Sequence, residues 1–458
     1  MKRHKQEKAA ALSAPSDLKK TVASVLGFGK GAGADETEVQ LDETIDALTR
    51  FANNAIHQNV AEHGLTVSIR TVVDGRTARA TTNRCDEDSL RRAVESSLEL
   101  AHSQPKNLRL LRMPGKQRYR AANRFSPETA ALTPEARARA VKQACDLAIR
   151  NGQVAAGIFS SGQTQHVLAN SRGLFAAYRQ TEGEFSITMQ DDPAASWAKA
   201  NSGSVRQIDP PALADRASKK AQMAKAAQEL APGKYTVILE PAAVLDLVGF
   251  LFYDFAATAL EDQRSCLNKR MGQPLFGENV GIVDDVYHPL QLGAPFDGEG
   301  LPRERVSLVE KGVPRNLVYS RASAKKAGKK PTGHGFALPN EYGEAPMNLV
   351  FSGGSSSVGK MIAGTDRGLL VTRVWYIREV DPYEKIMTGM TRDGLFLVQA
   401  GKVTSAVRNF RFNQSLIELL QNVQEMSPSV RATAEEAFEM VVPAMKVSGF
   451  NFTEATKF

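Results

Sequence analysis

Cysteine is scarce in this chain of 458 residues, which contains only Cys85, Cys145 and Cys266. These cysteines lie far apart without C-x-x-C spacing, which excludes a disulfide framework and a cysteine-rich zinc site. The chain also lacks any apolar run near the ~18 residues that cross a bilayer. Its N-terminal apolar stretch, residues 9–12, is shorter than the core of an export signal. We therefore expect a soluble protein of the reducing cytoplasm, with no membrane partner.

Histidines at metal-binding spacing are missing as well. A zinc hydrolase needs two histidines one helical turn apart and a glutamate that activates the bound water. No pair among the seven histidines has that spacing, so we assign no metal ligand and no cofactor to this chain. The histidines are His4, His57, His63, His102, His166, His288 and His334.

Other catalytic motifs are absent or incomplete. Residues 353–360, GGSSSVGK, resemble a phosphate loop, but Met361 stands where a hydroxyl residue would bind Mg²⁺. A glycine- and serine-rich turn that caps a short helix is the favoured interpretation. No G-x-S-x-G elbow occurs, Cys266 is expected to be buried, and His334 is interpreted as part of a flexible loop. We therefore assign no catalytic residue.

A surplus of positive charge is present, with a formal net charge of +8. Part of it lies in the N-terminal tail and part in RASAKKAGKK at residues 321–330, which we interpret as a solvated loop. Neither cluster contains aromatic residues on which bases could stack, so we do not expect a nucleic-acid partner. The basic residues are Lys2, Arg3, Lys5, Lys8, Arg321, Lys325, Lys326, Lys329 and Lys330.

The first half of the sequence predicts an antiparallel sheet with helices. Residues 65–73 alternate in period two, and Asp74-Gly75 supplies a tight hairpin turn before a returning strand, 76–82. Capping signals at Asp86 and Thr133 predict helices that end near residues 105 and 152. Between 154 and 189 we expect four short strands separated by glycine-containing turns. A helix beginning at Asp209 should then run to about residue 232.

The second half predicts a β-rich domain. A strand at 235–241 precedes a helical stretch, 242–261, and several short strands follow between glycine and proline turns. The fold class is therefore α+β: a mixed or antiparallel N-terminal sheet with helices, then a barrel-like or sandwich-like domain. The predicted divisions are a basic flexible tail (1–34), an N-terminal α/β domain (35–110), a central helix and strand-meander region (111–232) and a C-terminal β-rich domain (233–458).

The most unusual segment, residues 371–403, mixes charged and aromatic residues so that neither strand face is cleanly apolar. Such a strand can line a cavity. Thr391 to Gly394 reads as a turn that would place Arg392 and Asp393 near the strand end. There they could hold an extended peptide or pair with each other. Our candidate peptide-binding residues are Tyr376, Arg378, Arg392 and Asp393.

Two regions resemble the TldD/PmbA family. Residues 50–83, RFANNAIHQNVAEHGLTVSIRTVVDGRTARATTN, are similar to the opening pattern of that family. Residues 365–382, 387–403 and 407–415, which include TDRGLLVTRVWYIREVDP and VRNFRFNQS, are similar to its closing β-rich region. The resemblance covers the chain from about Asp35 onward.

The resemblance implies a cytoplasmic heteromeric metalloprotease that degrades unfolded peptides or trims modified ones. One subunit of that family carries an H-E-x-x-x-H zinc helix after the strand that opens the C-terminal domain. Here the corresponding residues, 237–262, contain no histidine. The resemblance therefore implies a zinc-free, substrate-holding subunit, with zinc in a histidine-bearing TldD-like partner.

Two other functions stay open at this stage. The chain could be a metallopeptidase-family hydrolase with a divergent site, for example one that uses His334 and a nearby carboxylate. Alternatively, its net charge would suit a basic nucleic-acid or gyrase-associated factor.

Overall fold

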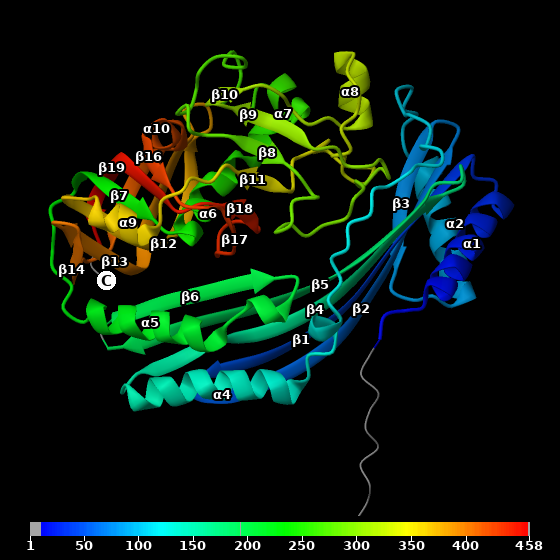
Figure 1. Cartoon of the computed structure of the whole chain (residues 1–458). Coiled ribbons are helices and arrows are strands. Elements are labelled where there is room, and N and C mark those ends of the chain that lie inside the picture. The colour runs from blue at the N-terminus through cyan, green and yellow to red at the C-terminus, as the bar shows by residue number, and fades with distance from the viewer. Residues whose placement is uncertain (1–10, 193, 457–458) are drawn as a thin grey trace, which may run out of the picture.

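The computed structural model describes residues 11–192 and 194–456, and Figure 1 shows the whole chain. The basic cluster formed by Lys2, Arg3, Lys5 and Lys8 lies outside the described residues. The prediction of a tail through residue 34 differs from the structure, because Pro15–Gly31 forms helix α1. This helix packs Leu18, Val22 and Val25 against the first sheet, which the charge-based interpretation of the segment overlooked.

The N-terminal half forms one antiparallel sheet of six strands in the order β3-β2-β1-β4-β5-β6. The pairing of β1 with β4 joins the predicted 35–110 and 111–232 regions within this single sheet. Its strands are β1 (Glu36–Ala52), β2 (Ala55–Val73), β3 (Arg76–Thr82), β4 (Val154–Asn170), β5 (Phe175–Asp191) and β6 (Ala194–Ser202).

Tight turns set the register of the long strands. Asp74 and Gly75 have φ of 47° and 70°, which confirms the predicted hairpin turn between β2 and β3. Asn53 and Asn54 make the corresponding turn between β1 and β2, with φ of 51° and 61°. Asparagine tolerates this left-handed region better than most residues, so the turn needs no glycine.

The strand meander differs from its prediction. Residues 154–191 form two long strands, and Gly162 and Gly183 lie inside them instead of in turns. A side chain at Gly183 would approach Val205 to 2.6 Å, and one at Gly162 would approach the Asp46 carboxylate to 2.7 Å. These glycines leave room for close neighbours, a role that a sequence pattern cannot separate from turn formation.

Four helices cover one face of the sheet. Helices α1 and α2 cover one end, and α4 and α5 cover the other (Figure 1). Asp86 and Thr133 cap α2 and α4 as predicted, and α5 ends at Ala224, short of the predicted residue 232. The helices of this half are α2 (Glu87–His102), α3 (Pro127–Ala130), α4 (Pro134–Arg150), η1 (Val205–Gln207) and α5 (Pro210–Ala224).

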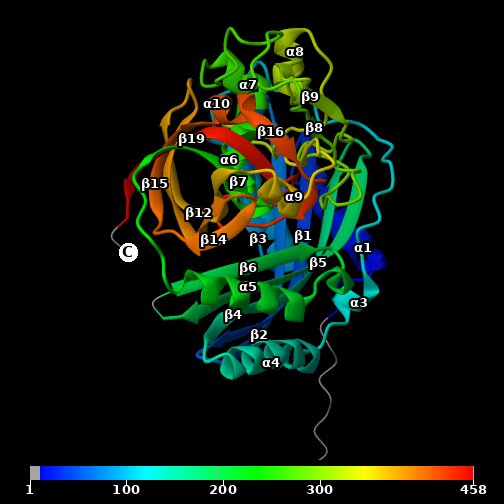
Figure 2. The same ribbon diagram turned by 60° about the vertical axis from the view of Figure 1, so that its left-hand side comes forward.

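The C-terminal half lies on the opposite face of the sheet and contains a closed barrel (Figure 2). Five strands pair in the cycle β12-β7-β19-β15-β13, and β12 and β13 close it, which confirms the barrel-like alternative. The strands of this seven-stranded sheet are β7 (Gly233–Leu239), β12 (Arg367–Asp381), β13 (Ile386–Gln399), β14 (Lys402–Ala406), β15 (Phe410–Ser415), β16 (Val423–Met426) and β19 (Met445–Ala455).

A smaller sheet and several short helices complete this half. The predicted helical stretch 242–261 forms three pieces, α6, η2 and α7. The sheet strands are β8 (Ile282–Asp284), β9 (Val306–Glu310), β10 (Val313–Pro314), β11 (Leu349–Phe351), β17 (Val430–Ala432) and β18 (Met440–Val442). The helices are α6 (Pro241–Val248), η2 (Gly249–Phe255), α7 (Ala257–Glu261), α8 (Arg321–Ala327), α9 (Val358–Ala363) and α10 (Leu416–Gln421).

Two motif interpretations have opposite outcomes. The phosphate-loop-like segment is a turn in which Ser357 caps α9, as predicted. The basic segment 321–330, predicted as a loop, forms helix α8, because Ser320 caps its start and Gly328 ends it with a φ of 62°.

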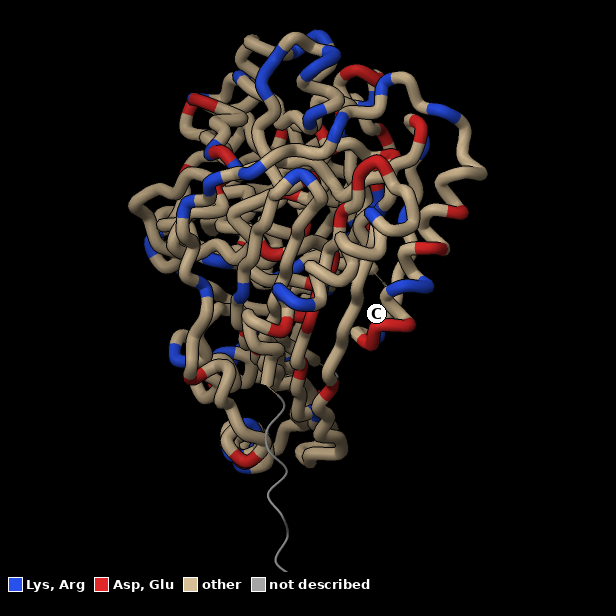
Figure 3. Tube along the Cα trace, turned by 90° about the vertical axis from the view of Figure 1, so that its right-hand side faces the viewer, with Lys and Arg blue, Asp and Glu red and all other residues tan. Residues whose placement is uncertain are grey.

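On the side shown in Figure 3, lysine and arginine positions are interspersed with aspartate and glutamate positions. Among the described residues, none of the helices is both long enough and apolar enough to span a bilayer.

The first sheet depends on Phe185, whose side chain is fully buried and contacts Phe51 and Phe159 at ring-centroid distances of 6.2 and 5.6 Å. We expect Phe185→Ala to lower the free energy of unfolding by about 3–5 kcal/mol, because it leaves a cavity in the core. Urea denaturation followed by circular dichroism measures this loss. Phe175→Ala, at a position 39% exposed, is the control and should change stability far less. Equal effects of the two substitutions would contradict this view of the core.

Candidate functional site

Strand β6 lies where the first sheet meets the C-terminal half. Its alternate residues Ala195, Trp197, Lys199 and Asn201 share one face. Asn201 accepts a hydrogen bond from the Nε of Arg431 at 2.7 Å. Lys199 donates to the carbonyl oxygen of Ala434 at 3.1 Å, and Trp197 lies under the guanidinium of Arg373 at 4.9 Å. The same face therefore contacts the C-terminal half along most of the strand.

A cluster of arginine and tryptophan forms the centre of this junction. Arg373 on β12 lies between the rings of Trp197 and Trp375, at 4.9 and 5.3 Å from their centroids. Its Nε donates to Asp393 on β13 at 2.8 Å. Arg392 lies over the same Trp375 ring, 5.1 Å from its centroid. Cation–π contacts thus restrain both arginine side chains, and a charge-assisted hydrogen bond also fixes Arg373.

Arg392 and Asp393 occupy a different backbone setting from the predicted one. The prediction of a turn at 391–394 is wrong, because these residues lie inside β13, where Asp393 and Gly394 form a bulge opposite Thr372 of β12. Asp393 and Gly394 have φ of 53° and 135°. The bulge breaks the pairing locally. A pair such as Asp393-Gly394 suits a bulge as well as a turn, so the sequence pattern did not separate the two.

Tyr376 and Arg378 lie at a second bulge, further along β12. The backbone N–H of Tyr376, with a φ of 52°, donates to the Oε1 of Glu436 at 2.7 Å. Arg378 reaches the same carboxylate at 3.8 Å. The Tyr376 side chain is 58% exposed. The four predicted residues thus form two pairs, one at each bulge.

A cleft of about 580 Å³ contains one of these pairs, Arg392 and Asp393. Its opposite wall comes from the start of β6 and from the segment after α5, and apolar side chains provide much of its lining. The apolar residues are Ala194, Ala195, Ala224, Ala226, Ala227, Met390, Leu395, Ala406 and Val407. On its outer edge, β6 has no paired strand within the described part of the chain, and its first residues, Ala194 and Ala195, line this cleft.

Helix α6 carries Asp246, which anchors the segment 431–439 that crosses β6. The carboxylate is fully buried and its Oδ1 accepts the backbone N–H groups of Glu436 and Ala437, at 2.8 and 3.2 Å. Burial raises the pKa of Asp246 to about 7, and these two N–H groups offset part of that effect. Its Oδ2 is a buried atom without a hydrogen-bond partner among the described residues.

The donor set around α6 does not suit a zinc ion. Zinc sites combine three or four histidine, cysteine or carboxylate ligands. Asp246 is engaged with backbone N–H groups, and Asp254 accepts the N–H of Cys266 at 2.7 Å and lies 2.6 Å from Lys385. Across residues 11–192 and 194–456, no three such side chains are placed to share an ion. We therefore derive no chemistry from a metal bound at this helix.

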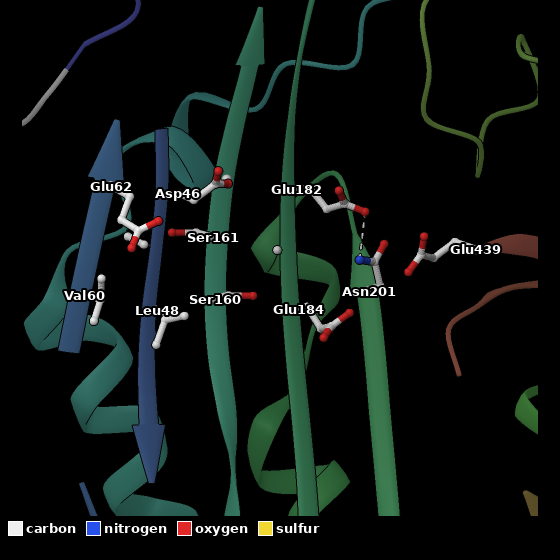
Figure 4. Close-up of a pocket in the computed structure, with 13 residues that line it drawn as sticks. Asp46, Leu48, Val60, Glu62, Ser160, Ser161, Glu182, Glu184, Asn201 and Glu439 are labelled. Carbon is white, nitrogen blue, oxygen red and sulfur yellow. Dashed lines mark hydrogen bonds between the residues drawn. The ribbon is translucent and has the colours of Figure 1, made fainter. Parts of the chain in front are cut away.

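A second pocket, of about 300 Å³, lies on the same face of the sheet and is lined by carboxylates (Figure 4). Asp46 and Glu62 are paired across β1 and β2, and burial together with Glu62 raises the pKa of Asp46. Glu182 and Glu184 project from β5, and Glu439 reaches in from the C-terminal half. The pocket is open and acidic, in contrast to the cationic cleft at the other end of β6.

His334 and Cys266 are both buried. His334, predicted to lie in a flexible loop, is 1% exposed and lies 2.9 Å from the Oδ1 of Asp284. Although burial alone would raise the pKa of Asp284, His334 beside it lowers that pKa. Cys266 is buried as predicted, and burial together with the Asp254 carboxylate raises the pKa of its thiol. Neither side chain lines the cleft or the acidic pocket.

Three important residues were missed by the sequence analysis. Trp197, Asp246 and Glu436 come from segments that read as ordinary strand, helix and loop, and their partners lie 60 or more residues away. One signal was available: Asp246 is a charged residue within the otherwise apolar stretch 241–252. Such a residue requires a buried partner.

The raised pKa of Asp246 makes stability depend on pH. Its stabilising contribution is complete below the unfolded pKa of about 4. It is lost as the pH rises through the folded pKa of about 7, because the buried group must then ionise. We expect Asp246→Asn to remove this loss. The stability of the variant relative to wild type should rise between pH 4 and pH 8, by at most about 4 kcal/mol at about 1.4 kcal/mol per pKa unit.

Urea denaturation of both proteins at several pH values measures this change. Asp366→Asn, at an exposed position, is the control and should show no such trend. A constant stability difference between Asp246→Asn and wild type across the range would contradict the assignment of the raised pKa.

Comparison with protein families gives matches along most of the chain. Residues 37–101 match the PmbA/TldA metallopeptidase domain 1, and residues 125–225 match the central domain of the same family. Residues 232–454 match the PmbA/TldA metallopeptidase C-terminal domain.

Individual relatives agree with this result. Metalloprotease PmbA of Escherichia coli O157:H7 is 22% identical over 457 residues, which cover 94% of this chain and 96% of the relative. The PmbA homologue of Haemophilus influenzae is 23% identical over 388 residues, covering 81% and 82%. The crystal structure of TldE from Thermococcus kodakarensis superposes with a TM-score of 0.86 at 20% identity, covering 95% of this chain and all of that chain. Since all three domains of one family match in order, this protein belongs to the TldD/PmbA family.

Proposed function

We propose that this chain is the zinc-free, substrate-holding subunit of a heteromeric TldD/PmbA-type metalloprotease that acts on unfolded or modified peptides. The observation that carries the proposal is the outer edge of β6, which borders a cleft of about 580 Å³ at the junction of the two halves. We also propose that the protein works in the cytoplasm, since Cys85, Cys145 and Cys266 are all unpaired.

An extended peptide suits this edge for a physical reason. An unpaired strand edge offers alternating N–H and C=O groups, and a peptide that adds as a further strand binds through its main chain. Such binding depends little on sequence, which fits unfolded substrates. The apolar lining of the cleft, including Ala195, Met390 and Val407, gives small side chains a place to pack.

The proposed division of labour follows from α6. In the family, a zinc-bearing subunit carries its histidines on the helix after the strand that opens the C-terminal domain. Here β7 leads into α6, and the charged residue of this helix is Asp246. Its carboxylate accepts hydrogen bonds from the backbone N–H groups of Glu436 and Ala437. A carboxylate used in this way supports the junction beside β6. We therefore place the zinc and the hydrolytic step in a histidine-bearing TldD-like partner.

The two alternative functions gain less support. A hydrolase built on His334 would need substrate access, whereas the His334 and Asp284 side chains are both fully buried. A nucleic-acid-binding factor would use the basic side chains of α8, but Lys326 of this helix is already paired with Glu261.

The proposal predicts the metal content and activity of the purified proteins. The chain alone should contain far less than one zinc per molecule and should not degrade an unfolded substrate such as reduced, carboxymethylated lactalbumin. Mixing it with a histidine-bearing TldD-like protein should produce chelator-sensitive proteolysis. Elemental analysis by mass spectrometry and gel-based proteolysis measure these properties.

A matched control uses the partner with both zinc-ligand histidines replaced by alanine, which should give an inactive mixture. Proteolysis by the present chain alone, abolished by chelator and restored by zinc, would contradict the proposal.

A further inference from the structure

We propose that Arg392 binds the C-terminal carboxylate of the peptide held at β6, so that this subunit recognises free peptide ends. The inference rests on the proposed function and adds a substrate class to it, namely peptides with a free C-terminus. It depends on three properties of the cleft: the availability of Arg392, the contact of its guanidinium with the Trp375 ring and the apolar lining beside it.

Arg392 is available because its nearest carboxylate is already occupied. Its Nε lies 3.7 Å from the Oδ2 of Asp393, beyond normal hydrogen-bond distance. That same oxygen accepts the Nε of Arg373 at 2.8 Å and also its Nη2. Arg373 is buried between two tryptophan rings, so it is the permanent partner of Asp393. The Arg392 side chain is 47% exposed and faces the cleft.

The other cations of the cleft are matched. Lys225 lies 2.6 Å from the Oδ1 of Asp191, and Arg408 lies 2.5 Å from the Oε1 of Glu229. With Asp393 neutralised by Arg373, the positive charge of Arg392 is the one left for a ligand among the described residues that line the cleft. An anionic ligand group is therefore favoured there.

Trp375 restrains the guanidinium of Arg392. The guanidinium carbon lies over the Trp375 ring, 5.1 Å from its centroid, in a cation–π contact. A planar carboxylate can accept two parallel hydrogen bonds from a guanidinium group. Because the arginine is already ordered by the ring, little side-chain entropy is lost when the carboxylate binds.

The surroundings indicate a peptide terminus and not a free inorganic anion. Apolar side chains of Ala195, Met390, Leu395 and Val407 line the cleft beside Arg392, where the last side chain of a peptide can pack. Ala194 and Ala195, at the start of the unpaired edge of β6, line the same cleft, where their main-chain groups can meet the preceding residues of the peptide. A terminal carboxylate at Arg392 would therefore set the direction and register of the bound chain.

The test compares one unstructured, fluorescently labelled decapeptide made with a free C-terminal carboxylate and with a C-terminal amide. Fluorescence anisotropy measures binding to the full chain in low salt. We expect the free acid to bind at least about tenfold more tightly, the usual size of a charge-assisted hydrogen bond. Arg392→Gln should weaken the free acid to the level of the amide and leave the amide unchanged.

Arg411→Gln is the matched control, because Arg411 is an exposed arginine on the neighbouring strand β15. It should preserve the tenfold preference, and thermal melting should show that both variants are folded. Equal binding of acid and amide to the wild-type protein, or a preference that survives Arg392→Gln, would overturn the inference while leaving the proposed function in place. Failure of both peptides to bind would overturn the two together.

Discussion

The antiparallel pairing of β1 with β4 is the contact on which the rest of the structure depends. It runs from Glu38 opposite Asn170 to Phe51 opposite Gly157 and joins segments more than 100 residues apart into one sheet. The pairing tolerates no side chain at Gly157, where a Cβ atom would meet the Ser186 carbonyl oxygen at 2.1 Å and the Phe51 ring at 2.7 Å. Because the sheet continues through β5, this pairing also determines where β6 lies.

The candidate site belongs to neither half alone. The first sheet contributes the edge of β6 and the Trp197 ring, and the barrel contributes the bulged strands that carry Arg373 and Arg392. Asp246 adds a third link, since it holds the backbone of the segment that crosses β6. Burying a carboxylate for this purpose lowers the free energy of unfolding at neutral pH. Such a cost is more typical of functional regions than of ordinary hydrophobic cores. The junction is therefore best understood as one structural unit.

Sequence reasoning succeeded where local chemistry decides the structure. The Asp74-Gly75 hairpin, the caps of α2 and α4 and the turn before α9 all follow from residues adjacent in the chain. It failed where glycine serves packing, as at Gly183, and where a bulge within a strand resembles a turn, as at 391–394. The candidate residue Arg392 was identified from its polar surroundings, but its Trp375 platform and the occupied Asp393 required the three-dimensional structure. Long-range partners leave no periodic signal in a single sequence.

Hydrogen–deuterium exchange on the full chain, with and without an unstructured peptide, tests the central claim most directly. If a peptide adds as a strand at the free edge, backbone amides within residues 194–202 should become protected, while β3 at the opposite edge of the same sheet should exchange as before. Protection at β3 or elsewhere, with β6 unchanged, would contradict the assignment of this edge as the peptide-holding site.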